Sequence, residues 1–427
     1  MTRTSAAFED TWREAYARLA AEVPRLAAAA RPLLAGFAAC VDKLLDLHEI
    51  APRLAEHPEA PARRFLEALM TRAAAGRGGE ILVDWPAGPA FLAPLAQGSA
   101  LGGTAAQAAW ALARLGAPAI IALGDRSADQ LAVLDPATWL ADGDGKLRRA
   151  GETAPEGEGK PAHYIVEYTA GRPLPGLVPT RSTRIIVRFA DEDIERDAAF
   201  RAYGRGHGAG AGAALLSGPN AVPPGPLEAA LDELADAAAE WRAAGIGLVH
   251  LELGEFAMPG TREAVLERLA GSVTSVGMNR SELRSLMPGV DEREALAALA
   301  WKLGARRAVM HADEWALAAT CGDPDIERDA LAAGCLLASA RAQAGRPVGA
   351  PKATDDAAFL PPPVPLVERR DGWSFVACPA PYLAQPRSTI GLGDTFTAGT
   401  MLVHCQPQHQ PILAGLDAAA GPFPLPA

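Results

Sequence analysis

Apolar residues follow two alternating patterns along this chain, one typical of amphipathic helices and one of short buried strands. Phe8, Trp12 and Tyr16 begin a helical repeat that predicts a helix over 8–31. Strands are predicted at 32–37, 80–84, 119–123, 246–251, 272–276, 307–310 and 373–377, and further helices at 60–75, 104–115, 227–243, 261–269, 292–303 and from 395. This alternation favours an α/β fold, a Rossmann-type three-layer sandwich around a parallel sheet.

A second pattern interrupts the alternation in the first half of the chain. The ranges 163–168 and 183–189 are rich in strand formers and have no long helix between them, which is typical of antiparallel strands. We therefore expect a small discontinuous α+β lid over a cleft. The expected large domain comprises 1–42, 96–154 and 196–427, and the expected lid comprises 43–95 and 155–195. Glycine- and proline-rich segments predict loops at 145–162, 204–212 and 345–366.

Composition narrows the classes of function. The 427 residues are 49% hydrophobic and 21% charged, which is enough apolar surface for a large core. The net charge is -11 and no long Lys/Arg run occurs, so we expect no nucleic-acid partner. No charge-free apolar run of membrane-spanning length or signal-peptide type is present, so we expect no membrane association. Five cysteines without a C-x-x-C pair favour neither a disulfide framework nor a zinc site, and fit a reducing cytoplasm.

The segment Arg387–Gly399 carries the sharpest chemical signal. Gly391 and Gly393 would let the backbone approach an anion, and the N–H groups at the start of a helix stabilise negative charge. Asp394 at that point could take the proton of an attacking hydroxyl, as phosphoryl transfer requires. The alternative reading is an ordinary helix start, in which Asp394 only caps the helix.

The segment Ser388–Gly399 resembles the GLGDT region of the ADP-dependent glucokinases and phosphofructokinases, a branch of the ribokinase-like superfamily. Further segments resemble that family in matching order along most of the chain: Gly36–Asp42, Gly102–Gly103, His163–Tyr168, Arg181–Ile186, His250–Glu252 and Asn279–Glu282. The ordered series, ending in the specific GLGDT, identifies the chain as a divergent member of this family. The resemblance implies a ribokinase-like fold.

The resemblance also implies roles for residues around the predicted cleft. Asp394 would be the general base, with Gly391 and Gly393 in an anion hole. Glu252 and Glu282 would act on Mg²⁺, which takes few carboxylates directly and keeps water ligands. His250, next to Glu252, is interpreted as structural. Residues that would contact the nucleotide are Arg181, Arg184, His311 and Leu392; for the two arginines a solvated strand face is the alternative, and for His311 a helix-start histidine.

Other segments that resemble the family supply the residues expected to bind the sugar. Asp42 would bind sugar hydroxyls, Gly102 and Gly103 would let backbone reach the sugar, and His163 and Glu80 are further candidates. The chain departs from the family pattern at Ala38, Cys40, Thr104 and Thr183, and at Arg280 beside the expected metal region. The first three changes concern the sugar side, so the acceptor could differ from glucose or fructose 6-phosphate.

We therefore expect an ADP- and Mg²⁺-dependent sugar kinase of carbohydrate metabolism and glycolysis, whose partners are ADP and a small sugar or sugar phosphate. A glutamate near the sugar favours an unphosphorylated, glucose-like acceptor, because it would repel a phosphate. Two alternatives stay open: an ATP-dependent ribokinase-like kinase of another sugar or nucleoside, and a sugar or nucleotide sensor without catalysis. The sequence does not indicate an oligomeric state.

Overall fold

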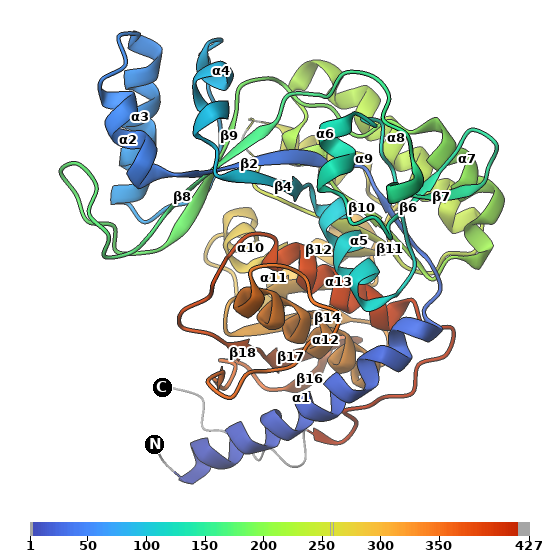
Figure 1. Ribbon diagram of the computed structural model, residues 1–427. Coiled ribbons are helices and arrows are strands. Elements are labelled where there is room, and N and C mark those ends of the chain that lie inside the picture. Colours follow the sequence, from blue (N-terminus) through green and yellow to red (C-terminus); the bar gives the residue numbers. More distant parts are fainter. Residues whose placement is uncertain (1–2, 257, 259, 417–427) are drawn as a thin grey trace.

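The computed structural model describes residues 3–256, 258 and 260–416 (Figure 1). Its largest feature is an eleven-stranded sheet with a parallel centre and antiparallel strands at both edges. In order across this sheet the strands are β16 (Val367–Arg370), β17 (Trp373–Pro379), β14 (Trp315–Thr320), β13 (Arg307–His311), β12 (Ser275–Asn279), β11 (Val249–Glu252), β10 (Ala213–Leu216), β1 (Leu33–Gly36), β5 (Ala119–Ile121), β6 (Trp139–Ala141) and β7 (Leu147–Arg149).

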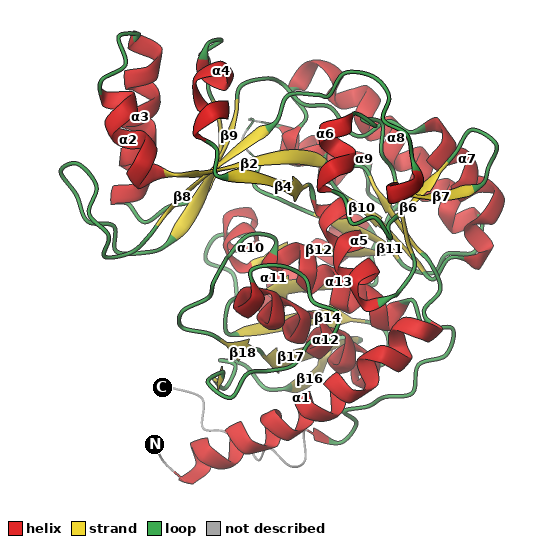
Figure 2. Ribbon diagram, viewed as in Figure 1, coloured by secondary structure: helices red, strands yellow, loops and turns green. Residues whose placement is uncertain are grey.

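Helices cover both faces of this sheet, because its central strands are apolar on both sides (Figure 2). Leu33 and Ala35 of β1 point into one core and Leu34 into the other. The first core contains side chains of α1 (Arg3–Ala29), α5 (Thr104–Leu115), α12 (Pro324–Ala344) and α13 (Leu392–His404). The second contains side chains of α7 (Ala198–His207), α8 (Pro224–Ala243), α9 (Thr261–Arg268), α10 (Arg280–Leu286) and α11 (Glu292–Leu303). The predicted three-layer α/β sandwich is confirmed.

A second, separate sheet has five strands, and we call it the lid sheet. Its order is β3 (Gly79–Leu82), β9 (Thr183–Arg188), β8 (His163–Tyr168), β2 (Cys40–Asp46) and β4 (Gly98–Gly102). Alternate residues such as Tyr164 and Val166 pack into a core with α2 (Leu47–Ala55), α3 (Ala60–Ala74) and α4 (Gly88–Leu92). The intervening His163 and Ile165 line a cleft on the opposite face.

The predicted antiparallel pairing of 163–168 with 183–189 is confirmed as β8 and β9. The predicted domain boundary at 42 falls inside β2, and that at 96 falls just before β4, which pairs with β2. The remaining short elements are α6 (Ala128–Val133), β15 (Ala358–Phe359), β18 (Pro381–Tyr382), and the 3-10 turns η1 (Ala93–Leu95), η2 (Ala150–Glu152), η3 (Gly208–Gly210) and η4 (Pro219–Ala221). Within the described ranges, no helix combines the length and apolar character needed to cross a bilayer.

One loop prediction is wrong, and a second is confirmed only over 153–162. The range 204–212 is not a flexible loop: its first part is the end of α7, where Gly204 packs against Trp241, followed by η3. The range 145–162 contains β7 at the edge of the large sheet. In both places glycine-rich composition masked an element that is held by tertiary packing or strand pairing.

Helices α12 and α13 approach each other closely enough that their contact requires glycine. A Cβ on Gly399 would lie 2.5 Å from the carbonyl oxygen of Ala333, and one on Gly334 would lie 2.6 Å from the ring of Phe396. Since α13 begins in the segment with Asp394, this contact fixes where that segment lies.

Replacing Gly399 with alanine should lower the free energy of unfolding by about 1–3 kcal/mol, because the methyl group overpacks the helix contact. Gly206→Ala is the matched control. It is also helical but has open space around its Cβ, so it should be neutral or stabilise by up to about 1 kcal/mol. Chemical denaturation of both variants measures the difference. Equal stability of the two would contradict the close helix contact.

Candidate active site

A cleft of about 960 Å³ lies between the lid sheet and the edge of the large sheet. Its lining includes every residue assigned a role from the sequence except Leu392, which is half-buried at the start of α13: Asp42, Glu80, Gly102, Gly103, His163, Arg181, Arg184, Glu252, Glu282, His311, Gly391, Gly393 and Asp394. Glu252 and His311 are the last residues of the parallel strands β11 and β13, and Asn279 is the last of β12 between them. The cleft thus lies at the carboxyl edge of the sheet, where α/β folds bind ligands.

The two glycines before Asp394 are needed because other side chains fill the space beside them. Gly391 has φ +66°, and a Cβ there would collide with the guanidinium of Arg341. A Cβ on Gly393 would lie 2.8 Å from Cε1 of His311. The start of α13 is therefore packed between the Arg341 guanidinium and the His311 imidazole. The unpaired N–H groups of a helix lie at its first turn, which here lines the cleft.

Asp394 lies in the first turn of α13 and lines the cleft. It is not the N-cap residue, since Gly391 holds that position without a side-chain bond. The negative charge of Asp394 contributes to raising the pKa of Asp42, Glu252 and Glu282. One carboxylate is thus within electrostatic reach of both the lid-side Asp42 and the acids Glu252 and Glu282.

Arg341 is a buried cation behind Gly391 that the sequence reasoning missed. It lies on α12 and is almost fully buried; its Nη1 donates to Thr395 Oγ1 at 2.8 Å, and its guanidinium lies 5.4 Å from the centre of the Trp110 ring. Burial lowers its pKa to about 10, and the charge of Asp394 opposes that effect. The available signal was a single arginine within the apolar helical pattern of 330–342.

A chain of hydrogen bonds orients Glu252. The first links join Arg307 Nη1 to Ser275 Oγ (3.1 Å) and Ser275 Oγ to His250 Nδ1 (2.7 Å). His250 is fully buried, and burial lowers its pKa well below the usual value, so the ring is neutral. Its Nε2 lies 2.8 Å from Glu252 Oε2, which also accepts from Thr397 at 3.1 Å. Because Ser275 donates to Nδ1 of His250, the ring proton is on Nε2 and is donated to the Glu252 carboxylate. Both bonds to Glu252 are made to Oε2, and they fix the orientation of the carboxylate and thus the position of Oε1.

Glu282 is fixed differently, by a capping box at the start of α10. Its Oε2 accepts from the backbone N–H of Asn279 at 2.8 Å, and the Asn279 side chain accepts from the Glu282 N–H at 2.9 Å. Burial raises the pKa of Glu282 to about 8, and the charges of Glu252, Glu255 and Asp394 add to the effect. Glu282 is thus both a helix-start acid and a cleft residue.

The donor set of Glu252 and Glu282 fits a hard divalent cation. Each carboxylate has one oxygen committed to the protein and one left for a ligand. Burial also raises the pKa of Glu252 to about 7. The charges of His311 and Arg307 oppose this rise. The charge of Asp394 adds to it, and Glu252 in turn raises the pKa of Glu282. A bound cation would offset the repulsion among these acids.

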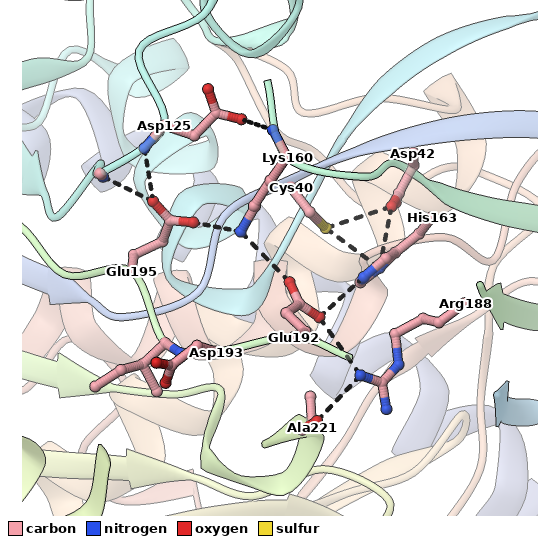
Figure 3. Close-up of polar contacts among 12 residues, drawn as sticks. Cys40, Asp42, Asp125, Lys160, His163, Arg188, Glu192, Asp193, Glu195 and Ala221 are labelled. Atoms are coloured by element: carbon pink, nitrogen blue, oxygen red, sulfur yellow. Dashed lines mark hydrogen bonds and ion pairs between the residues drawn. The ribbon is translucent and has the colours of Figure 1, made fainter. Parts of the chain in front are cut away.

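On the lid side, Asp42 belongs to a polar cluster with Cys40, His163 and Glu192 (Figure 3). Asp42 Oδ1 lies 3.8 Å from His163 Nδ1, and His163 Nε2 lies 2.9 Å from Glu192 Oε2. Burial raises the pKa of Asp42 to about 6. Although burial opposes it, the hydrogen bond and charge of His163 lower the pKa of Glu192 to about 2. Glu192, absent from the sequence-based set, therefore orients His163.

The cations beside this cluster are already paired with acids. Arg188 forms a buried ion pair with Glu80, and Lys160 bridges Glu192 and Glu195. Burial raises the pKa of Glu80. The lid side of the cleft thus presents carboxylates whose neighbouring cations are already paired within the protein.

Backbone contacts complete the cleft at two places. Gly103 has φ +85°, and a Cβ there would lie 2.6 Å from the Ala38 carbonyl. From the lid sheet, Arg184 Nη1 donates to the Thr389 carbonyl at 3.0 Å. Arg184 therefore joins the lid to the segment that carries Asp394, whereas Arg181 is exposed at the cleft rim.

Comparison with known proteins identifies the family of the chain. Residues 31–403 match the model of the ADP-specific phosphofructokinase/glucokinase conserved region. Over 188 residues the chain is 29% identical to an ADP-dependent glucose/glucosamine kinase of Pyrococcus furiosus, a match that spans 36% of this chain and only 41% of that relative.

Solved structures share the fold at low sequence identity. An ADP-dependent kinase in complex with fructose 6-phosphate and ADPβS is 16% identical, with a TM-score of 0.76 over 93% of this chain and 98% of that one. A hypothetical ADP-dependent phosphofructokinase of Pyrococcus horikoshii OT3 is 17% identical, with a TM-score of 0.69 over 88% and 98%. Since the family model covers most of the sequence, the chain belongs to the ADP-specific phosphofructokinase/glucokinase family.

Proposed function

We propose that this protein transfers the terminal phosphoryl group of ADP to a hydroxyl of a neutral, glucose-like sugar. The observation that carries the proposal is the convergence, in one cleft, of Asp394 at the start of α13, the acids Glu252 and Glu282, and the lid-side pair Asp42 and His163. Phosphoryl transfer needs an oriented hydroxyl, a proton acceptor and stabilisation of charge on the transferred group.

In this mechanism Asp42 accepts hydrogen bonds from sugar hydroxyls, and Asp394 accepts the proton of the attacking hydroxyl. The N–H groups at the start of α13 stabilise the charge of the transferred phosphoryl group, with the Arg341 guanidinium packed against Gly391. Glu252 and Glu282 would hold Mg²⁺, which when bound neutralises phosphate charge. The contact of Arg184 with the Thr389 carbonyl keeps the lid near the phosphoryl group and excludes water.

Asp394→Asn should lower kcat by about 10²- to 10⁴-fold, because the amide cannot take the proton. Release of AMP from ADP and of ADP from ATP, each with glucose and Mg²⁺, measures both activity and donor choice. We expect sugar-dependent AMP release from ADP and little reaction with ATP. Faster turnover of ATP would favour the ATP-dependent alternative.

The same variant separates a kinase from a sensor. Asp394→Asn should keep the rise in unfolding temperature caused by nucleotide and Mg²⁺, since the carboxylate acts on the sugar hydroxyl. If the wild type shows this ligand-induced stabilisation but no turnover with any sugar of a broad panel, the protein is a sensor.

The acceptor is expected to be neutral because Glu80 and Asp42 are acidic and the neighbouring Arg188 and Lys160 are paired. A phosphate on the sugar would meet carboxylates there, and it would have to displace an ion pair to find a cation. Glucose should therefore have a higher kcat/KM than fructose 6-phosphate in a steady-state assay. Turnover of fructose 6-phosphate with none of any neutral sugar would overturn this assignment.

The raised pKa values of Glu252 and Glu282 predict a pH-dependent effect of Mg²⁺. The ordinary glutamate pKa is 4.5, whereas these groups titrate at about 7 and 8 in the native state. At a pH between the unfolded pKa of 4.5 and the native pKa values of about 7 and 8, the native state binds more protons than the unfolded state. Without metal, the free energy of unfolding therefore falls as pH rises from about 5 to 8. Mg²⁺ binds the ionised acids, so its addition should raise the unfolding temperature more at pH 8 than at pH 6.

The double variant Glu252→Gln, Glu282→Gln tests the source of this effect. It should lose most of the Mg²⁺-induced stabilisation at pH 8, while the exposed control Glu267→Gln should retain it. A Mg²⁺ effect of equal size at both pH values, or one unchanged in the double variant, would contradict the assignment of these two acids.

A further inference from the structure

The cluster at the start of β2 contains more metal-binding chemistry than sugar binding requires. Cys40 Sγ, a ring nitrogen of His163 and a carboxylate oxygen of Glu192 lie within 4.8 Å of one another. Asp42 Oδ1 lies beside them, 3.5 Å from Cys40 Sγ. Thiolate, imidazole and carboxylate together are ligands of zinc and similar thiophilic cations, whereas Mg²⁺ prefers oxygen.

The spacing of three of these atoms matches one face of a tetrahedral zinc site. Cys40 Sγ lies 3.4 Å from His163 Nδ1 and 3.5 Å from Asp42 Oδ1, and the last two atoms are 3.8 Å apart. Zn–S bonds of about 2.3 Å and Zn–N and Zn–O bonds of about 2.0–2.2 Å give tetrahedral edges of roughly 3.4–3.6 Å. The three atoms therefore need shifts of only a few tenths of an ångström to share one ion.

Glu192 occupies the position of an outer partner rather than a ligand. Its Oε2 lies 2.9 Å from His163 Nε2, the ring nitrogen other than the one that contacts Cys40 (Figure 3). A carboxylate on the far nitrogen fixes the ring and places the proton on Nε2, which leaves the Nδ1 lone pair for a metal, as in carboxylate–histidine–zinc triads. Lys160 in turn holds Glu192 in place.

Glycine at 102 lets the Cys40 and Asp42 side chains approach each other at the wall of the cleft. Gly102 pairs with Cys40 across β2 and β4, and a Cβ on Gly102 would collide with both Cys40 Sγ and Asp42 Oδ1. Cys40, Asp42, His163 and Gly102 all line the cleft. A fourth coordination position therefore opens toward the cleft, as in zinc sites that bind water or a substrate.

We propose that Cys40, Asp42 and His163 form a binding site for Zn²⁺, with Glu192 orienting His163 and the fourth position open to the cleft. Binding displaces the thiol proton of Cys40 to solvent, since only the thiolate is a ligand. Bound Zn²⁺ would use the side chains of Asp42 and His163 as ligands. Because the same side chains are proposed to bind the sugar, Zn²⁺ competes with the sugar. This last consequence rests on the proposed function; the binding itself does not.

Cobalt spectroscopy tests the site without relying on catalysis. Full-length protein, reduced and stripped with EDTA, is titrated with Co²⁺ in excess Mg²⁺, which occupies the oxygen site. The wild type should develop tetrahedral visible bands and a thiolate-to-cobalt charge-transfer band up to one equivalent, and Zn²⁺ should abolish both. A weak spectrum without the thiolate band would overturn the proposal, whether or not the protein is a kinase.

Variants assign the ligands. Cys40→Ser should remove the charge-transfer band and weaken Zn²⁺ binding at least about tenfold, and Glu192→Gln should weaken it about 10- to 100-fold. Cys321→Ser, which alters the exposed cysteine, should leave both unchanged. A band that survives in Cys40→Ser and is lost in Cys321→Ser would place the ion on the surface and refute the site.

Kinetics then tests the consequence. Zn²⁺ should inhibit sugar phosphorylation competitively with the sugar and not with ADP, and Cys40→Ser should raise its inhibition constant at least about tenfold. Zn²⁺ binding at Cys40 with inhibition competitive only with ADP would contradict the competition with sugar. If the protein binds Zn²⁺ at Cys40 but phosphorylates no sugar even when Zn²⁺ is absent, the proposed function is refuted and the metal site is still supported.

Discussion

The close packing at the start of α13 is the constraint on which the site depends. Glycine at 391 and 393 allows the helix to begin against Arg341 and His311, and glycine at 334 and 399 allows α12 and α13 to touch along their backbones. These contacts fix Asp394 at the carboxyl edge of the sheet. A helix start held in this way can direct its N–H groups at an anion without moving during the reaction.

Uncompensated negative charge is the second organising feature. Burial raises the pKa of Glu252 and of Glu282, and the charge of Asp394 adds to the effect on both. Hydrogen-bond donors restrain the acids: the chain from Arg307 through Ser275 and His250 orients Glu252, and a capping box orients Glu282. The protein thus holds its carboxylates rigidly but leaves their charge to be balanced by ligands, which is typical of sites for metal ions and phosphates.

The layered fold and the start of α13 were predictable because their signals are local, whereas most of the other cleft residues were assigned through the resemblance to a known family. Strand and helix periods marked β1, β5, β11, β12 and β13, and the glycine-aspartate segment marked the start of α13. Pairwise chemistry between distant segments was not predictable in this way. Arg341 and Glu192 matter through neighbours far along the chain, and the cysteine spacing favoured no zinc site because Cys40 meets His163 only through the pairing of β2 with β8. The glycine-rich end of α7 was read as a loop because its packing on Trp241 is tertiary.

The central claim is transfer of a phosphoryl group from ADP to a sugar rather than to water. Phosphorus NMR of a mixture of the protein, ADP, Mg²⁺ and glucose measures the fate of that group directly. The structure predicts AMP and a sugar phosphate accumulating in equal amounts, with no inorganic phosphate. Accumulation of inorganic phosphate beside AMP would mean that the cleft does not orient the acceptor. An unchanged ADP spectrum with glucose and with every other neutral sugar would contradict the proposed function.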